Sequence, residues 1–289
     1  MKKIRKAVVP VAGYGTRFLP ISKTIPKEML PIVDKPLIHH IVLELVEAGI
    51  EQIILVTNSY KKSVEDYFDR HLELEMKLQE SGKEKELKEL QQISELAEFV
   101  YVRQKEQRGN GDAILPAKNI IGDEPFLVFW GDDFIKAEPS RAKQLIEAYE
   151  KYQSVILGCI KTNKEEDTKK YGFIAGPKIA DGVIEVENLV EKPGPGNAPS
   201  NLAVVSGFVF IPEIFNALES VETEPGQELV WVDGVNVLKN QGHKIYATEI
   251  KNGKYYDCGN VTEYLKTNIE LSLKHPQIGP QIKDFLQTL

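Results

Sequence analysis

The sequence feature that most constrains this chain is a short apolar run near the N-terminus that ends in a glycine-rich loop. Residues Ala7 to Val11 are apolar and mostly β-branched, which is typical of a buried strand. The next residues, Gly13-Tyr14-Gly15-Thr16-Arg17, hold two glycines that permit tight turns and close approach of the backbone to a ligand. Such a loop can direct several N–H groups at a phosphate. The pattern therefore indicates an anion-binding loop at the end of a buried strand.

The residues after this loop carry charges that suit a polyphosphate. Arg17, Lys23 and Lys27 could neutralise phosphate oxygens. Glu28 is the acid among them, and its carboxylate could accept hydrogen bonds from sugar hydroxyls or a base edge. A Gly-x-Gly sequence after a strand is also a common turn, so these residues alone leave the function open.

The first sixty residues predict a β-loop-α-β unit. Apolar spacing predicts a helix from Leu37 that ends at Gly49, and Ile53 to Thr57 reads as a second buried strand. Alternation of this kind predicts a parallel sheet with helices on both faces and ligands at the carboxyl ends of the strands.

The rest of the chain continues the alternation. Residues 61–97 predict one or two amphipathic helices with solvated charged faces. A hairpin-like region is expected from Tyr171, with its turn at Gly182 and alternation through 183–190. The remaining strands are expected at 99–102, 126–130, 154–161, 202–211 and 243–250, and helices at 227–239 and 260–274.

Two acids follow the strongly apolar strand at 126–130. Asp132 and Asp133 would lie at the carboxyl end of that strand, where Mg²⁺ could bind beside a nucleotide through carboxylate and phosphate oxygens. The alternative is an acid that caps a helix near Glu138. This segment alone does not decide between the two.

Several motifs together resemble the bacterial sugar-1-phosphate nucleotidylyltransferases. These are A-G-x-G-T-R-F-L-P, P-K-E-M-L-P and V-D-K-P between residues 12 and 36, G-D-D at 131–133, Y-G at 171–172, E-K-P at 191–193 and D-C-G at 257–259. The resemblance covers nearly the whole chain. It implies an α/β class: one Rossmann-like, three-layer αβα domain around a central mixed, mostly parallel sheet. The nucleotide half would span about 1–135 and the sugar half about 136–259, with C-terminal helices at about 260–289.

The resemblance also implies roles for individual residues. Catalytic roles would fall to Arg17, Lys27, Asp132 and Lys192. Substrate contacts would come from Ala12, Gly13, Gly15, Thr16, Glu28, Gln104, Gly109, Asp133, Gly172, Glu191 and Gly207. Within these sets, Gln104 and Gly109 would read the base, Glu191 would hold sugar hydroxyls, and Lys192 would pair with the sugar phosphate. Asp132 would bind Mg²⁺, and Asp257 is a further candidate ligand.

The activity implied by the resemblance is Mg²⁺-dependent transfer of UMP from UTP to glucose 1-phosphate, with release of pyrophosphate. The runner-up is the same chemistry with another nucleotide, such as dTTP, or another hexose 1-phosphate. A non-catalytic nucleotide-sugar sensor is a third possibility. The family often forms dimers or tetramers, so a homo-oligomer is expected.

Three segments depart from the family pattern. Asp112 stands where a histidine is usual, residues 205–208 read V-S-G-F instead of V-G-R-Y, and residues 228–233 read E-L-V-W-V-D instead of E-I-Q-L-T-D. These changes leave the substrate pair open.

Composition and missing motifs argue against other classes. The net charge of −7 disfavours a general nucleic-acid binder, and no apolar run approaches a membrane span. We also expect no signal peptide and, with two cysteines and no C-x-x-C, a cytoplasmic location. Phe18 occupies the third glycine position of a dinucleotide fingerprint, and G-x-x-x-x-G-K-[ST] is absent from the sequence, which argues against an NAD enzyme and a P-loop kinase.

Overall fold

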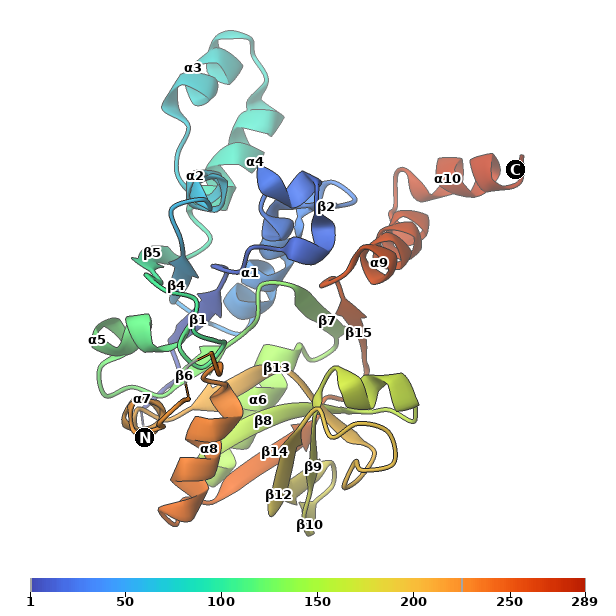
Figure 1. The fold of residues 1–289 in the computed structure, drawn as a ribbon. Coiled ribbons are helices and arrows are strands. Elements are labelled where there is room, and N and C mark those ends of the chain that lie inside the picture. The colour runs from blue at the N-terminus through green and yellow to red at the C-terminus, as the bar shows by residue number, and fades with distance from the viewer. Residues whose placement is uncertain (1, 225, 289) are drawn as a thin grey trace.

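A large mixed sheet forms the centre of the molecule (Figure 1). The computed structural model describes residues 2–224 and 226–288. The strands run in the order β10-β11-β14-β8-β13-β6-β1-β4-β5, with β9 also paired to β13 and β12 paired to β9. Their bounds are β1 Lys6–Pro10, β4 Gln52–Thr57, β5 Glu98–Arg103, β6 Phe126–Val128, β8 Val155–Lys161, β9 Gly172–Ala175, β10 Lys178–Ala180, β11 Val183–Glu185, β12 Asn188–Glu191, β13 Leu202–Phe210 and β14 Ile245–Glu249.

The first strands form the parallel part of this sheet. β1 pairs in parallel with β4 on one side and β6 on the other, and β4 pairs in parallel with β5. β13 then runs antiparallel to both β6 and β8 and joins the two halves of the sheet. The mixed sheet with helices on both sides confirms the predicted fold class.

Two small sheets complete the strand inventory. β7 (Asp133–Ala137) pairs antiparallel with β15 (Gly253–Asp257), and β2 (Pro31–Ile32) pairs with β3 (Lys35–Pro36). Neither β7 nor β15 was predicted. The suggestion that an acid at 132–133 caps a helix near Glu138 is wrong, because Asp133 begins β7 and the next helix starts at Arg141 behind a Ser140 cap.

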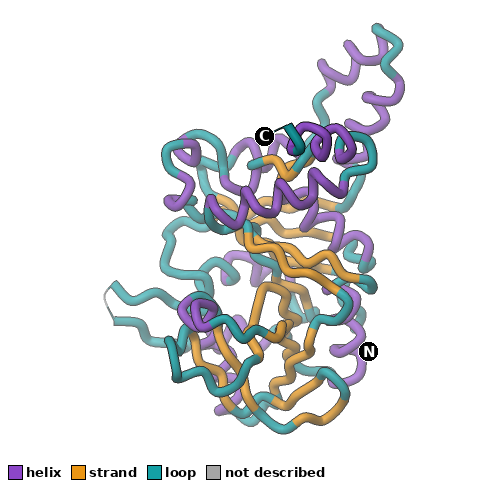
Figure 2. The backbone as a smooth tube through the Cα atoms, turned by 90° about the vertical axis from the view of Figure 1, so that its right-hand side faces the viewer, coloured by secondary structure: helices purple, strands orange, loops and turns teal. Residues whose placement is uncertain are grey.

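The helices cover the sheet and extend beyond it. Their bounds are α1 Leu37–Glu47, α2 Lys62–Phe68, α3 Leu72–Glu80, α4 Glu84–Ser94, α5 Lys118–Ile121, α6 Arg141–Tyr152, α7 Glu213–Glu219, α8 Trp231–Asn240, α9 Val261–Lys274 and α10 Gly279–Leu286. α6 packs on β8, β13 and β14, while α7 and α8 pack on each other. α3 and α4 form a hairpin that stands away from the sheet in both views (Figures 1 and 2).

Two helix predictions need correction. Residues 61–97 hold three helices, α2 to α4, where one or two were expected. The helix expected at 227–239 begins only at Trp231. Val230 is extended, and Leu229 exchanges backbone hydrogen bonds with the turn at Arg108 to Gly111.

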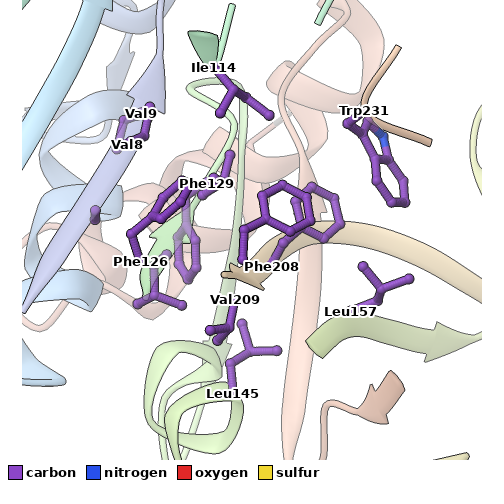
Figure 3. Packing of buried hydrophobic residues seen from close by; sticks show 14 of the residues in the cluster. Val8, Val9, Ile114, Phe126, Phe129, Leu145, Leu157, Phe208, Val209 and Trp231 are labelled. Atoms are coloured by element: carbon purple, nitrogen blue, oxygen red, sulfur yellow. The ribbon is translucent and has the colours of Figure 1, made fainter. Parts of the chain in front are cut away.

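The core lies where the middle strands meet the helices. Val8 and Val9 of β1, Phe126 of β6, and Val209 of β13 are all fully buried, and Leu145 of α6 packs beneath them (Figure 3). The continuous apolar sequence of β1 follows from this position, since a strand paired on both sides with both faces covered offers no solvated face. This rigid layer fixes where the loops after β1, β5 and β6 can lie.

Candidate active site

A cleft of about 900 Å³ opens at the carboxyl ends of β1, β5 and β6. Thirteen of the sixteen predicted site residues line it, namely Ala12, Gly13, Arg17, Lys27, Glu28, Gln104, Gly109, Asp132, Asp133, Gly172, Glu191, Lys192 and Asp257. Segments far apart in the sequence therefore meet at the edge of the sheet where α/β folds bind ligands.

The loop after β1 offers a row of free backbone donors. Within the described part of the chain, the N–H groups of residues 12 to 16 donate to no protein acceptor. Gly15 adopts a left-handed conformation (φ 65°), and a Cβ there would lie 3.3 Å from Ser22. Backbone amides arranged in such a turn suit a phosphate. Gly15 and Thr16 belong to this loop but do not line the cleft itself.

The Ala12 carbonyl is already occupied. The side-chain amides of Asn58 and Gln107 both donate to it, at 2.5 and 2.6 Å. Neither residue was predicted. Asn58 directly follows β4, so its place at the carboxyl end of a parallel strand was the signal that could have identified it.

Lys27 and Asp132 form an ion pair on the floor of the cleft. Lys27 Nζ lies 2.5 Å from Asp132 Oδ2. Burial alone would raise the pKa of Asp132, but the Lys27 charge and hydrogen bond, with Arg17 nearby, hold it below its usual value. Burial opposes the charge on Lys27 too, yet Asp132 and Glu28 raise the pKa of that ammonium. Both groups are therefore charged at neutral pH.

Asp257 brings a second carboxylate beside Asp132. Tyr256 and Asp257 end β15, where Asp257 is the register partner of Asp133. A Cβ added to Gly259 would lie 3.1 Å from Asp257 Oδ1 and 3.2 Å from Asp132 Oδ2, so both oxygens flank this glycine. Arg17 donates to the Gly259 carbonyl at 3.2 Å. Two carboxylates at an open cleft are the ligand set that Mg²⁺ shares with substrate phosphates.

Asp133 faces the protein interior. It accepts a hydrogen bond from Arg141 Nη1 at 3.0 Å, and the same fully buried guanidinium forms two hydrogen bonds with Glu44, at 3.0 and 2.9 Å. Burial raises the pKa of Asp133 above its usual value although Arg141 opposes this effect. Asp133 therefore contributes to the cleft as a buried support. Arg141 was not identified from the sequence.

Gly207 is the predicted substrate residue that the structure places elsewhere. It does not line the cleft, although its neighbours Ser206 and Phe208 do. It has φ 112°, and a Cβ there would lie 2.9 Å from Arg141 Cδ and 3.0 Å from Leu145. The glycine is needed for close approach of α6, and a break in the β13–β8 register between Val204 and Phe208 accompanies it.

Glu28 lines the cleft and also has a partner inside the protein. It is buried and pairs with Lys61 Nζ at 2.7 Å. Burial raises the pKa of the Glu28 carboxyl, and Lys61 and Lys27 lower it only in part. The carboxylate thus already has a cation partner. Lys61, directly before α2, was not predicted to belong to the site.

The other side of the cleft holds the sugar-side candidates. A Cβ at Gly172 would lie 3.0 Å from Glu191 Oε2, so the carboxylate sits directly against this glycine. Lys192 Nζ lies 3.7 Å from Glu191 Oε1, and burial raises the pKa of Glu191 despite that cation. Lys169 and Lys170 line the same wall. This wall is positively charged overall.

Comparison with known proteins agrees with this geometry. Residues 6–273 match the sequence model of the family described as Nucleotidyl transferase. The chain is 45% identical over 290 residues to the UTP–glucose-1-phosphate uridylyltransferase of Bacillus subtilis, covering 100% of this chain and 98% of that protein. 

Solved structures give the same picture. The structure of the UTP-bound UGPase from Acinetobacter baumannii superposes with a TM-score of 0.90 at 38% identity and 99% coverage of both chains. A UDP-glucose pyrophosphorylase complexed with UDP-glucose gives a TM-score of 0.84 at 42% identity, over 94% of this chain and 100% of that one. With a family match across most of the sequence and relatives of this identity over its full length, the chain belongs to the nucleotidyl transferase family.

Proposed function

We propose that this protein transfers UMP from UTP to glucose 1-phosphate and releases pyrophosphate. The observation that carries the proposal is the convergence of a free amide loop, the Asp132–Asp257 carboxylates, and the Glu191–Lys192 wall in one cleft. The relatives named above carry out, by their names, this same reaction. A sugar phosphate and a nucleotide would each find groups of suitable chemistry on opposite sides of that cleft.

The nucleotide would bind on the β1 side. The free N–H groups of residues 12 to 16 would hold phosphate oxygens, and Arg17 and Lys27 would neutralise the departing pyrophosphate. Gln104 and Gly109, which follow β5, would contact the base. Gly109 packs against Leu229 with no room for a side chain, and this contact holds the turn at its place beside the cleft.

The sugar phosphate would bind on the wall formed by β9 and β12. Glu191 would accept hydrogen bonds from sugar hydroxyls beside Gly172, and Lys192 would orient the phosphate. A phosphate oxygen of the sugar then attacks the α-phosphorus of UTP in line, and the bond from that phosphorus to the bridging oxygen of pyrophosphate breaks. No covalent enzyme intermediate is required, so the residues act by positioning and charge neutralisation.

Mg²⁺ fits the carboxylates of this site. Asp132 and Asp257 would hold the ion, and their number and oxygen chemistry match a metal that takes its remaining ligands from phosphates and water. When bound, Mg²⁺ would neutralise charge on the phosphate oxygens. Lys27 contacts Asp132 and would also be available to the phosphates.

The first experiment is a pyrophosphate-release assay across four nucleoside triphosphates and a panel of hexose 1-phosphates. We expect the fastest release with UTP and glucose 1-phosphate, and its loss on chelation of Mg²⁺. A strong preference for another pair would keep the chemistry and change the specificity. No release with any pair, together with tight binding of UDP-glucose, would leave the non-catalytic sensor.

Location and assembly are also proposals. Cys159 and Cys258 are buried free thiols, and burial raises the pKa of each to about 12, which is compatible with a reducing cytoplasm. No helix among the described residues is both long and apolar enough to cross a membrane. Exposed Leu265 and Ile269 on α9 support the expected homo-oligomer.

A further inference from the structure

Both carboxylate oxygens of Asp112 accept hydrogen bonds from neighbouring side chains. Arg108 donates to Oδ1 from Nη2 at 2.8 Å and from Nε at 3.1 Å, while Gln104 Nε2 donates to Oδ2 at 2.8 Å. Asp112 and Gln104 are both buried, at 6% and 7% exposure. Asp112 is also the residue that departs from the histidine of the family pattern.

This contact fixes which end of the Gln104 amide faces Asp112. A carboxylate paired with a guanidinium is ionised and can only accept hydrogen bonds, so the amide must present its NH₂ group to it. Gln104 lines the cleft, and in the described residues no protein donor contacts its Oε1. The carbonyl oxygen is therefore the amide atom left for a ligand.

The turn that carries Asp112 is held rigidly. Leu229 N donates to the Arg108 carbonyl at 2.7 Å, and Gly111 N donates to the Leu229 carbonyl at 2.9 Å. Asn110 Oδ1 accepts from Trp231 N at 2.9 Å. Asp112 thus cannot easily move away from Gln104, and the orientation of the amide is preset before a ligand enters.

We propose that Asp112 is a positioning residue that sets base specificity, by holding Gln104 with its carbonyl toward the cleft. The proposal rests on the proposed function. Uracil and thymine carry an N–H at ring position 3, and the Gln104 carbonyl would accept a hydrogen bond from it. Cytosine carries a lone pair at that position, which would face the carbonyl oxygen without a proton between them. A site built for an N–H in this way rejects a base that lacks it, because its buried acceptor is left unpaired.

The test is the near-isosteric variant Asp112→Asn. Its side-chain amide can present either NH₂ or C=O to Gln104, so the Gln104 amide is free to turn over. We measure kcat/KM for UTP, dTTP and CTP with glucose 1-phosphate, with Asp123→Asn, an exposed aspartate, as the matched control. The UTP-to-CTP ratio is expected to fall by about 10- to 100-fold in Asp112→Asn, chiefly through KM. The UTP-to-dTTP ratio is expected to stay constant, because both bases carry the N–H.

Each other outcome overturns the assignment. Parallel losses for all three nucleotides would mean that Asp112 only supports the loop. An unchanged UTP-to-CTP ratio would mean that Gln104 is not oriented by Asp112. The wild-type protein tests the proposed function separately. If the wild type transferred UMP to no sugar phosphate, the proposed function would be wrong; the outcomes above concern only the role of Asp112. Far-UV circular dichroism and thermal unfolding establish that the variants are folded.

Discussion

At the scale of single residues, the site is defined by charges that already have partners. Lys27 is bound to Asp132, Glu28 to Lys61, and Asp133 to Arg141. Each pair places a cation beside a carboxylate at a buried or half-buried position, where an unpaired charge would be costly. The Lys27–Asp132 pair lowers the electrostatic cost of the site before substrate arrives, and an entering polyphosphate would take over the contact with Lys27.

Removal of the charge on Asp132 or on Lys192 should greatly slow turnover and leave the fold intact. Asp132→Asn and Lys192→Ala are each expected to lower kcat by about 10²- to 10⁴-fold, because charge stabilisation of the transition state is lost. Steady-state pyrophosphate release measures this, with Asp123→Asn as a neutral control. Near-normal rates in a folded variant would remove that residue from the mechanism.

At the scale of elements, close backbone contact positions the loop after β5. A Cβ at Gly109 would lie only 2.2 Å from the Leu229 carbonyl oxygen, and Gly109 has φ 120°. The loop can therefore lie this near the segment before α8 only because a glycine stands there. The geometry connects α8 to the proposed base-contacting residues.

Gly109→Ala should displace this loop. We expect the KM for UTP to rise by at least about tenfold, since the turn must move away from Leu229 and carries the base contacts with it. Gly194→Ala is the matched control, because Gly194 also has a positive φ (79°) but an added Cβ would meet no atom within 4 Å. If both variants raise KM equally, backbone strain and not the close contact is responsible.

The contact between α1 and α2 should make stability depend on pH. His39 of α1 is buried with Nδ1 3.0 Å from the hydroxyl of Tyr67 on α2, and burial lowers its pKa to about 4. The unfolded chain therefore takes up a proton at this site between pH 6.5 and 4 that the folded protein does not, so stability is lost as pH falls through that window.

Urea denaturation measures this effect. The free energy of unfolding should fall by about 1–2 kcal/mol between pH 6.5 and 5 in the wild type, and by less in His39→Gln. His243→Gln, at a half-buried position after α8, serves as control. Equal pH dependence in wild type and His39→Gln would assign the loss to other groups, among them His40, whose pKa burial also lowers.

The sequence predicted those strands well whose apolar residues form one continuous run. The strands at β1, β4, β5 and β8 were found because their apolar runs are continuous. β7 and β15 were missed because each mixes polar with apolar residues and pairs with a strand far away in the sequence. The late start of α8 at Trp231 was missed for a similar reason, since Leu229 is held by backbone hydrogen bonds to the distant turn at Arg108 to Gly111.

The site followed the same rule. Most residues of the sequence motifs line the cleft, but the residues that hold them in place were not predicted. Lys61, Arg141 and Asn58 belong to none of the motifs. Gly207 was assigned to the substrate by the family resemblance, and in the structure the group that lies against it is the Arg141 side chain. The sequence shows which residues have side chains that could bind a ligand. Which of them face the cleft depends on tertiary packing.

At the scale of the whole molecule, one buried charge network joins distant segments. Arg141 of α6 bridges Glu44 of α1 and Asp133 of β7 and is fully buried. It also donates a hydrogen bond to the Ser206 carbonyl of β13 at 2.7 Å. Its guanidinium also stacks over Phe129, 4.1 Å from the ring centroid. The network links the strands of both predicted halves behind the cleft.

Glu44→Gln should weaken the whole fold. Loss of one carboxylate leaves a buried guanidinium undercompensated, so we expect the free energy of unfolding to fall by about 3–5 kcal/mol. Equilibrium urea denaturation measures it, with the exposed Glu47→Gln on the same helix as control. An effect no larger than that of the control would show that the pair contributes little net stability.

The antiparallel pairing of β7 with β15 has a consequence for biosynthesis. Asp132 emerges from the ribosome long before Asp257, and only the completed ribbon sets the two carboxylates side by side. A nascent chain that stops short of β15 therefore lacks the paired acids. The acid pair is completed only when the C-terminal part of the chain has been made and has folded against β7.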